Sequence, residues 1–161
     1  FEEVAITYEM SANPVVLMPG AAEVLVRLSA AGMRLAIVSN AQFYTPMILE
    51  TLFQLSLSEL GFVATVWSFE LGIAKPSPSV FAELSKRLDR YTPSRAVYVG
   101  NDMLNDVYTA ACAGLRTVLF AGDETSLRLR SGDIRVNGTT PDATITDLLQ
   151  LVSILTMGEQ R

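Results

Sequence analysis

Two aspartates that follow a short apolar run are the residues of this chain most suited to chemistry. The run Val97–Val99 is followed, after Gly100, by Asp102 and Asp106, which stand four residues apart. This spacing places two side chains on one side of a helix, and carboxylate oxygens are ligands that Mg²⁺ prefers. We predict a divalent-metal site at this turn. Taken alone, Asp102 is equally suited to capping the helix that follows, and Asp106 is typical of a solvated helix residue.

Three further polar residues follow two other apolar runs. Ser39 and Asn40 come directly after Leu35–Val38, and Lys75 lies beyond the run Thr65–Phe69. The carboxyl ends of parallel strands meet at one edge of a sheet, where α/β proteins bind ligands. We expect the hydroxyl, amide, ammonium and carboxylate groups there to hold one small anion beside Mg²⁺ and to neutralise a transferring phosphoryl group. Individually, Ser39-Asn40 is typical of a turn and Lys75 of the surface.

Helical and extended patterns alternate along the chain, and these elements must position the site. Continuous apolar runs predict buried strands, whereas Thr-Pro and Ser-Pro pairs predict the starts of helices. The expected strands are 35–38, 65–69, 96–99, 117–120 and a weaker 143–145; the expected helices are 1–12, 21–31, 45–57, one starting at 77–78, one after 102 and one after 146. This order predicts an α/β fold with three α/β/α layers around a parallel sheet.

The composition excludes several classes of protein. The 161 residues suit one domain, and 12 basic against 17 acidic residues give a net charge of −5, which argues against a nucleic-acid partner. No apolar run approaches the roughly 20 residues of a membrane helix, and the first residues do not resemble a signal peptide, so we expect a cytoplasmic protein without membrane contact. The sequence has no histidine, which excludes Ser-His-Asp triads and imidazole-bound zinc. Catalysis must therefore use carboxylates, hydroxyls and lysine.

Three motifs together resemble those of the haloacid dehalogenase (HAD)-like hydrolase superfamily, from Pro19 onward. In order, they are Val38-Ser39-Asn40, Lys75-Pro76-Ser77-Pro78 and Gly100-Asn101-Asp102-Met103-Leu104-Asn105-Asp106. The resemblance implies a Rossmann-like fold and a Mg²⁺-dependent phosphatase. It implies that Ser39 and Asn40 bind the phosphoryl group and that Lys75 offsets charge on this group and its nucleophile, so Ser39 and Lys75 are the catalytic candidates. It also implies that Asp102 and Asp106 orient the metal.

The chain departs from the family pattern at two places. Family members begin with an apolar strand ending in Asp-x-Asp, whose first aspartate attacks phosphorus; this sequence has no Asp-x-Asp, and residues 1–34 contain no aspartate. The resemblance implies that the missing strand is central, between the strands that end at Val38 and Val99, so its loss leaves unpaired backbone groups. The second departure is Asn101, because either Asn101 or Asp102 fits the first position of the metal motif.

These departures shape the expected domains and function. We expect a truncated chain, in which residues 1–18 are the remnant of a helical cap with its return linker and residues 19–161 form the HAD-like core. The expected activity of the parent protein is hydrolysis of a small phosphorylated metabolite through an aspartyl-phosphate. Its aspartate is not in this chain, so the chain alone is expected to be inactive. A homodimer or the missing N-terminal segment would complete the sheet.

Alternative functions stay open at this stage. One is a non-catalytic HAD-like binding or interaction module, which the missing nucleophile and the 50% hydrophobic composition favour. Another is a haloacid dehalogenase, which needs no metal and would leave the acidic pair without a purpose. A third is a receiver-like signalling module, for which Asp102 is the candidate phosphorylation site.

Overall fold

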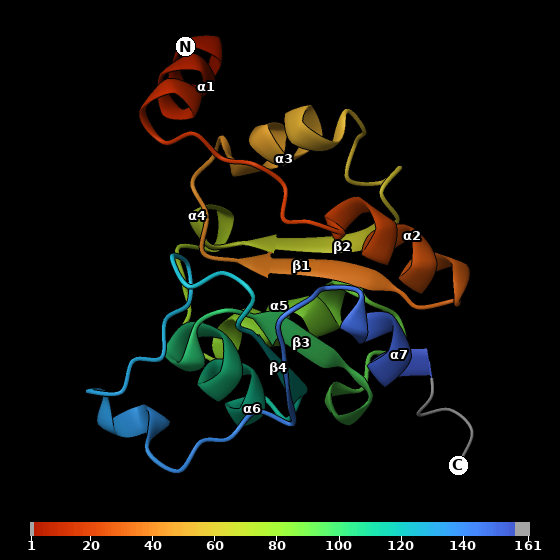
Figure 1. Cartoon of the computed structure of the whole chain (residues 1–161), viewed down its shortest axis with the longest axis vertical. Helices are drawn as coiled ribbons and strands as arrows, with labels where there is room; N and C mark the ends of the chain where they lie inside the picture. The colour runs from red at the N-terminus through yellow and green to blue at the C-terminus, as the bar shows by residue number, and fades with distance from the viewer. Residues whose placement is uncertain (1, 157–161) are drawn as a thin grey trace.

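Parallel strands alternate with helices in the computed structural model, which describes residues 2–156 (Figure 1). The strands are β1 (Leu35–Ser39), β2 (Phe62–Trp67), β3 (Val97–Gly100), β4 (Arg116–Phe120) and β5 (Ala143–Ile145). The helices are α1 (Glu2–Ala12), α2 (Ala21–Ala30), α3 (Thr45–Phe53), α4 (Ser68–Leu71), α5 (Ser79–Arg87), α6 (Thr109–Cys112) and α7 (Gln150–Thr156), with a π-helical segment over Met103–Tyr108. The predicted α/β class is confirmed.

The strands form two separate parallel sheets rather than one. β1 pairs with β2, with Val38 opposite Val66, and β3–β4–β5 form the second sheet in that order. Among the described residues β1 and β3 face each other without pairing, and Figure 1 shows the two sheets one above the other in this region. The break lies between the strands ending near Val38 and Val99, where the sequence predicts a missing strand.

Two hydrophobic clusters hold the sheets together from opposite faces. Leu35 and Val38 are three residues apart on β1, so their side chains point to opposite faces. Val38 joins a cluster in which α5 contributes Phe81, and Leu35 joins a second cluster with residues of α2, α7, β4 and β5. Helices therefore cover both faces, which gives the expected three layers.

Several predicted boundaries shift for local reasons. The expected strand 65–69 is observed at Phe62–Trp67, because Ser68 begins α4. The expected helix 45–57 ends at Phe53, where Gln54 adopts a left-handed conformation with φ of 55°. The helix after Asp102 starts with a π-helical turn, in which the Thr109 hydroxyl donates a hydrogen bond of 2.8 Å to the Leu104 carbonyl.

The N-terminal part of the chain is a helix followed by an extended linker. The predicted helix 1–12 is observed as α1, and an extended stretch leads from it to α2. The division into residues 1–18 and 19–161 stays a prediction, and its outermost parts, residue 1 and residues 157–161, lie outside the described residues. Within residues 2–156, none of the helices has the length and apolar character needed to cross a bilayer.

Candidate active site

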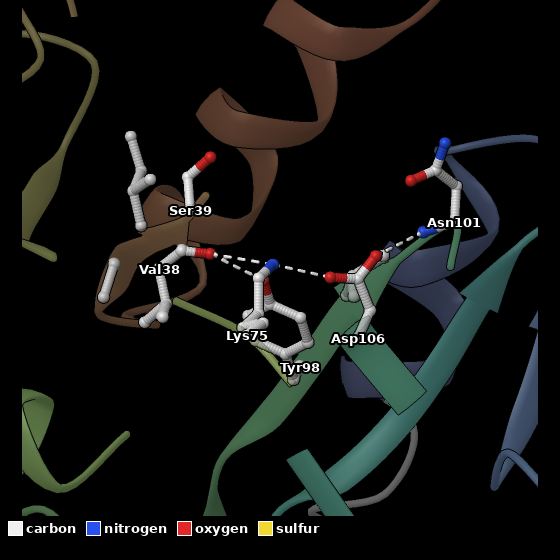
Figure 2. Close-up of a pocket in the computed structure, with 10 residues that line it drawn as sticks. Val38, Ser39, Lys75, Tyr98, Asn101 and Asp106 are labelled. Atoms are coloured by element: carbon white, nitrogen blue, oxygen red, sulfur yellow. Dashed lines mark hydrogen bonds and ion pairs between the residues drawn. The ribbon is translucent and has the colours of Figure 1, made fainter. Parts of the chain in front are cut away.

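A cavity of about 350 Å³ lies between β1 and β3 and gathers most of the predicted site residues. Ser39 and Lys75 line it together with Asp106, as the sequence predicts, and Tyr98 and Asn101 complete its polar lining. Figure 2 shows Ser39 and Asp106 on opposite sides of this cavity, with Lys75 between them. The strands β1, β2 and β3 lead to Ser39, Lys75 and Asp106 respectively, and their carboxyl ends lie at the same edge. Residues far apart in sequence therefore meet here.

Lys75 is the centre of the polar network. Its ammonium donates to the Asp106 carboxylate at 2.6 Å, to the Tyr98 hydroxyl at 2.6 Å and to the Val38 carbonyl at 3.3 Å. The side chains of Lys75 and Asp106 are only 8% and 9% exposed, so each buried charge depends on the other. All three ammonium protons have acceptors, which fixes the position of the positive charge at the edge of the cavity.

Asn40 holds the backbone of Lys75. Its side-chain oxygen accepts the Lys75 amide N–H at 2.8 Å, and its side-chain NH₂ donates to the Lys75 carbonyl at 2.9 Å. The two bonds tie the loop carrying Lys75 to the end of β1. The side chain of Asn40 therefore positions the lysine in this structure, whereas the neighbouring Ser39 lines the cavity itself.

Asp106 joins the lysine to the turn after β3. One carboxylate oxygen accepts from Lys75, and the other accepts the backbone N–H groups of Asn101 and Asp102, both at 3.0 Å. Gly100 makes this possible, because a Cβ at that position would overlap the Asp106 carboxylate. Backbone amides and a glycine thus fix the acid that faces Lys75.

Replacing Gly100 with alanine is expected to destabilise the protein by about 1–3 kcal/mol, because the new methyl group must displace Asp106 from its amides. Chemical denaturation of Gly100→Ala and of the parent protein measures this loss. Gly132→Ala is the matched control, since nothing lies within 4 Å of a Cβ there. Equal losses in both variants would contradict the proposed packing of Asp106 on Gly100.

Asp102 lies differently from Asp106 and is not among the residues that line the cavity. It caps the following helix by accepting the N–H groups of Leu104 at 2.9 Å and Asn105 at 3.0 Å, and it pairs with Arg130 at 2.7 Å. Burial acts to raise the pKa of Asp102, but the bonds from Arg130 and from the helix amides outweigh it and lower this pKa. The capping role open at the sequence level is therefore observed.

Tyr98 is the site residue that sequence reasoning missed. Its hydroxyl donates to the Val38 carbonyl at 2.6 Å while it accepts from Lys75, so it connects β3 to β1 across the break between the sheets. Burial, followed by the negative charge of Asp106, raises the pKa of Tyr98 well above its ordinary value and keeps the phenol protonated as a donor. A tyrosine hydroxyl inside an otherwise apolar strand is the signal that could have identified it.

Mg²⁺ fits only part of this arrangement. Asp106 faces the cavity and retains one free lone pair on the oxygen that accepts from Lys75, so it suits one metal ligand. The oxygens of Asp102 are occupied by helix amides and Arg130. Across the part of the chain that the structure describes, no group of three or more Cys, Asp or Glu side chains converges on a metal position. These residues alone do not complete a Mg²⁺ site.

The sequence also matches a known family of hydrolases. The sequence model of the haloacid dehalogenase-like hydrolase family matches residues 3–114, which is most of the chain. The chain therefore belongs to the haloacid dehalogenase-like hydrolase family, as the resemblance at the sequence level implied.

Individual relatives are named as phosphatases. The chain is 34% identical over 140 residues to a ribulose-1,5-bisphosphate 5-phosphatase of Halopiger xanaduensis, covering 86% of this chain and 56% of that protein. It is 29% identical over 139 residues to a glyceraldehyde 3-phosphate phosphatase of Pyrococcus furiosus, covering 86% and 54% respectively. The crystal structure of a HAD phosphatase from Thermococcus onnurineus superposes with a TM-score of 0.69 at 25% identity, covering 86% of this chain and 58% of that one. The chain spans little more than half the length of these relatives.

Proposed function

We propose that the complete protein is a phosphatase that hydrolyses a small phosphorylated metabolite. The observation that carries this proposal is the buried ammonium of Lys75, fixed at the edge of a cavity that Ser39 also lines. A fixed cation and a hydroxyl at the carboxyl ends of parallel strands suit a phosphoryl group. The names of the two curated relatives, both phosphatases of phosphorylated sugars, support the same substrate class.

The residues of this chain would bind and neutralise the phosphoryl group rather than attack it. The Ser39 hydroxyl would donate to a phosphoryl oxygen, and the positive charge of Lys75 would offset the negative charge on the phosphoryl group and on an attacking carboxylate. Attack would form a bond from an aspartate oxygen to phosphorus and break the bond from phosphorus to the substrate's alcohol oxygen; water would then release phosphate. A bound Mg²⁺ would neutralise further charge, with Asp106 as one ligand.

The attacking aspartate would come from a strand that fills the break between the sheets. β1 and β3 present unpaired edges to the cavity, and the Val38 carbonyl on β1 accepts from Lys75 and Tyr98 instead of from a neighbouring strand. A strand placed there would take the place of Lys75 and Tyr98 at the Val38 carbonyl and would end beside Lys75 and Ser39, in reach of the bound phosphoryl group. We propose that an N-terminal segment of the complete protein supplies it, rather than a second copy of this chain.

Phosphate release measured on two proteins tests this proposal. One is the 161-residue chain; the other is the same chain preceded by an apolar strand that ends in Asp-x-Asp. Ribulose 1,5-bisphosphate and glyceraldehyde 3-phosphate are the probes, each with and without Mg²⁺. We expect release only from the longer protein and stimulation by Mg²⁺. Equal activity of the 161-residue chain, or activity that rises with dimer formation, would contradict the proposed strand.

One observation favours haloacid dehalogenase as the second candidate. Both acids of the predicted metal pair have other partners, since Asp106 pairs with Lys75 and Asp102 with Arg130, and neither ion pair requires a metal. The same two proteins assayed with a 2-haloacid separate the reactions. Halide release without phosphate release would replace the phosphatase proposal, whereas absence of both in the longer protein would favour a non-catalytic binding module.

A further inference from the structure

Asp102 has no capacity left for another ligand. Its Oδ1 accepts the N–H groups of Leu104 and Asn105, and its Oδ2 accepts the Asn105 side-chain NH₂ at 3.1 Å. The Arg130 guanidinium adds bonds to Oδ2 from Nε at 3.1 Å and from Nη2 at 2.7 Å. A carboxylate offers about four lone pairs, and these donors occupy all of them.

Arg130 belongs to the segment after β4, which lies alongside the turn after β3 and forms a parallel bridge between Asp102 and Arg128. The Arg128 N–H donates to the Asn101 carbonyl at 2.9 Å, and the Met103 N–H donates to the Arg128 carbonyl at 2.8 Å. The Asn101 side-chain NH₂ donates to the Ser126 carbonyl at 2.7 Å. The segment 122–130 is thus fastened to residues 101–103 by backbone and side-chain bonds.

The ion pair at the end of this segment has a specific geometry. Arg130 has a φ of 55°, a left-handed conformation that arginine adopts only when its surroundings hold it there. Asp102 is 7% exposed, so its negative charge needs the guanidinium and the helix amides that surround it. The ion pair with Asp102 offsets the cost of this backbone conformation at Arg130.

Asn101, rather than Asp102, is the residue at this end of the motif that borders the cavity. It lines the cavity, and Figure 2 shows it on the same side as Asp106, across from Ser39. Its side-chain NH₂ is bonded to Ser126, and its side-chain oxygen is a ligand type that Mg²⁺ accepts. Of the polar residues of this motif, Asn101 and Asp106 therefore line the cavity and Asp102 does not.

We infer that Asp102 is not a metal ligand but an anchor that, with Arg130, fastens the 122–130 segment to the turn after β3, and that Asn101 and Asp106 are the motif residues available to a metal. The part of the inference that concerns Mg²⁺ rests on the proposed function; the part that concerns the anchor does not. The first position of the metal motif is thereby assigned to Asn101.

Three single substitutions test the two parts separately. Asp102→Asn and Arg130→Gln remove the anchor's charges, and Asn101→Asp adds a carboxylate to the cavity. For each variant and the parent, calorimetric titration with MgCl₂ measures metal affinity, and limited proteolysis measures opening of the 122–130 segment. Both measurements use the complete protein, at a temperature where every variant is folded.

The inference predicts different effects on Mg²⁺ affinity for the two anchor variants and for Asn101→Asp. Asp102→Asn and Arg130→Gln should each accelerate cleavage in the 122–130 segment several-fold while Mg²⁺ affinity changes by less than about threefold. Asn101→Asp should tighten Mg²⁺ binding about tenfold or more, in the range by which residues around a metal alter affinity. Because it also removes the side-chain donor to the Ser126 carbonyl, cleavage in the 122–130 segment should rise in this variant too, and only its Mg²⁺ affinity tests the metal position. Loss of Mg²⁺ affinity in Asp102→Asn but not in Arg130→Gln would overturn the assignment of the metal position. Unchanged cleavage in both anchor variants would overturn the anchor, whatever the protein's activity.

Discussion

Replacing Lys75 with methionine is expected to cost about 3–5 kcal/mol of folding free energy and to abolish binding of inorganic phosphate. The substitution leaves the Asp106 carboxylate buried without its cation, and loss of one partner of a buried ion pair has this magnitude. It also removes the positive charge at the edge of the cavity, so a bound anion would meet only the negative charge of Asp106. Chemical denaturation gives the first quantity and calorimetric titration with phosphate gives the second.

Lys86 provides the matched control for this experiment. Its side chain is 72% exposed and pairs with Glu83 one helical turn away, so Lys86→Met should change the stability by less than about 0.5 kcal/mol and leave phosphate binding intact. Similar results for Lys75→Met and Lys86→Met would show that Lys75 is neither a buried partner nor an anion ligand, and the proposed function would lose its main support.

The Asp106→Asn variant is expected to be destabilised by a similar amount, but combining it with Lys75→Met should cost far less than the sum of the two losses. Asparagine retains an oxygen that can accept the N–H groups of Asn101 and Asp102, so the single variant loses mainly the charge opposite Lys75. The double variant has no isolated buried charge. A double-mutant cycle from denaturation curves should therefore give a coupling energy of about 2 kcal/mol or more.

Strict additivity in that cycle would mean that the two side chains stabilise the fold independently.

A further variant, Tyr98→Phe, removes a neutral hydroxyl from the same network, and its stability is measured in the same way. It should cost about 1.5–3 kcal/mol, because the Val38 carbonyl retains the bond from Lys75 but the Lys75 ammonium loses one of its three acceptors. A loss for Tyr98→Phe as large as for Asp106→Asn would indicate that the hydroxyl, rather than the ion pair, holds the two sheets together.

The sequence allows the strands and the cavity-lining residues to be predicted because each signal is local. The continuous apolar run Leu35–Val38 predicts a buried strand, and Ser39, Lys75 and Asp106 all follow such runs, so topology alone brings them to one edge. The break between the sheets lies where the strand expected to be missing would stand, and that expectation rests on a whole motif rather than on the conformation of any one residue.

The remaining contacts join residues that are far apart in the sequence, so no local sequence pattern predicts them. Tyr98 meets Val38, which is 60 residues away, and Arg130 meets Asp102 across 28 residues, so neither pairing has a signature in sequence spacing. The four-residue interval predicts that Asp102 and Asp106 share a helix face, but Asp102 precedes the first helical residue and turns toward the helix amides. Capping geometry, rather than helical periodicity, decides where that carboxylate points.

The break between β1 and β3 also bears on how assembly of the sheet would depend on protein concentration. A sheet that receives its central strand from the same polypeptide folds at a rate independent of concentration. When the strand arrives as a separate polypeptide, the encounter is bimolecular, and at high dilution activity would rise with the product of the two concentrations. If the proposed strand and activity hold, the facing edges of β1 and β3 would let this chain serve as one half of a split-enzyme complementation pair, whose recovered activity would report that its two parts had met.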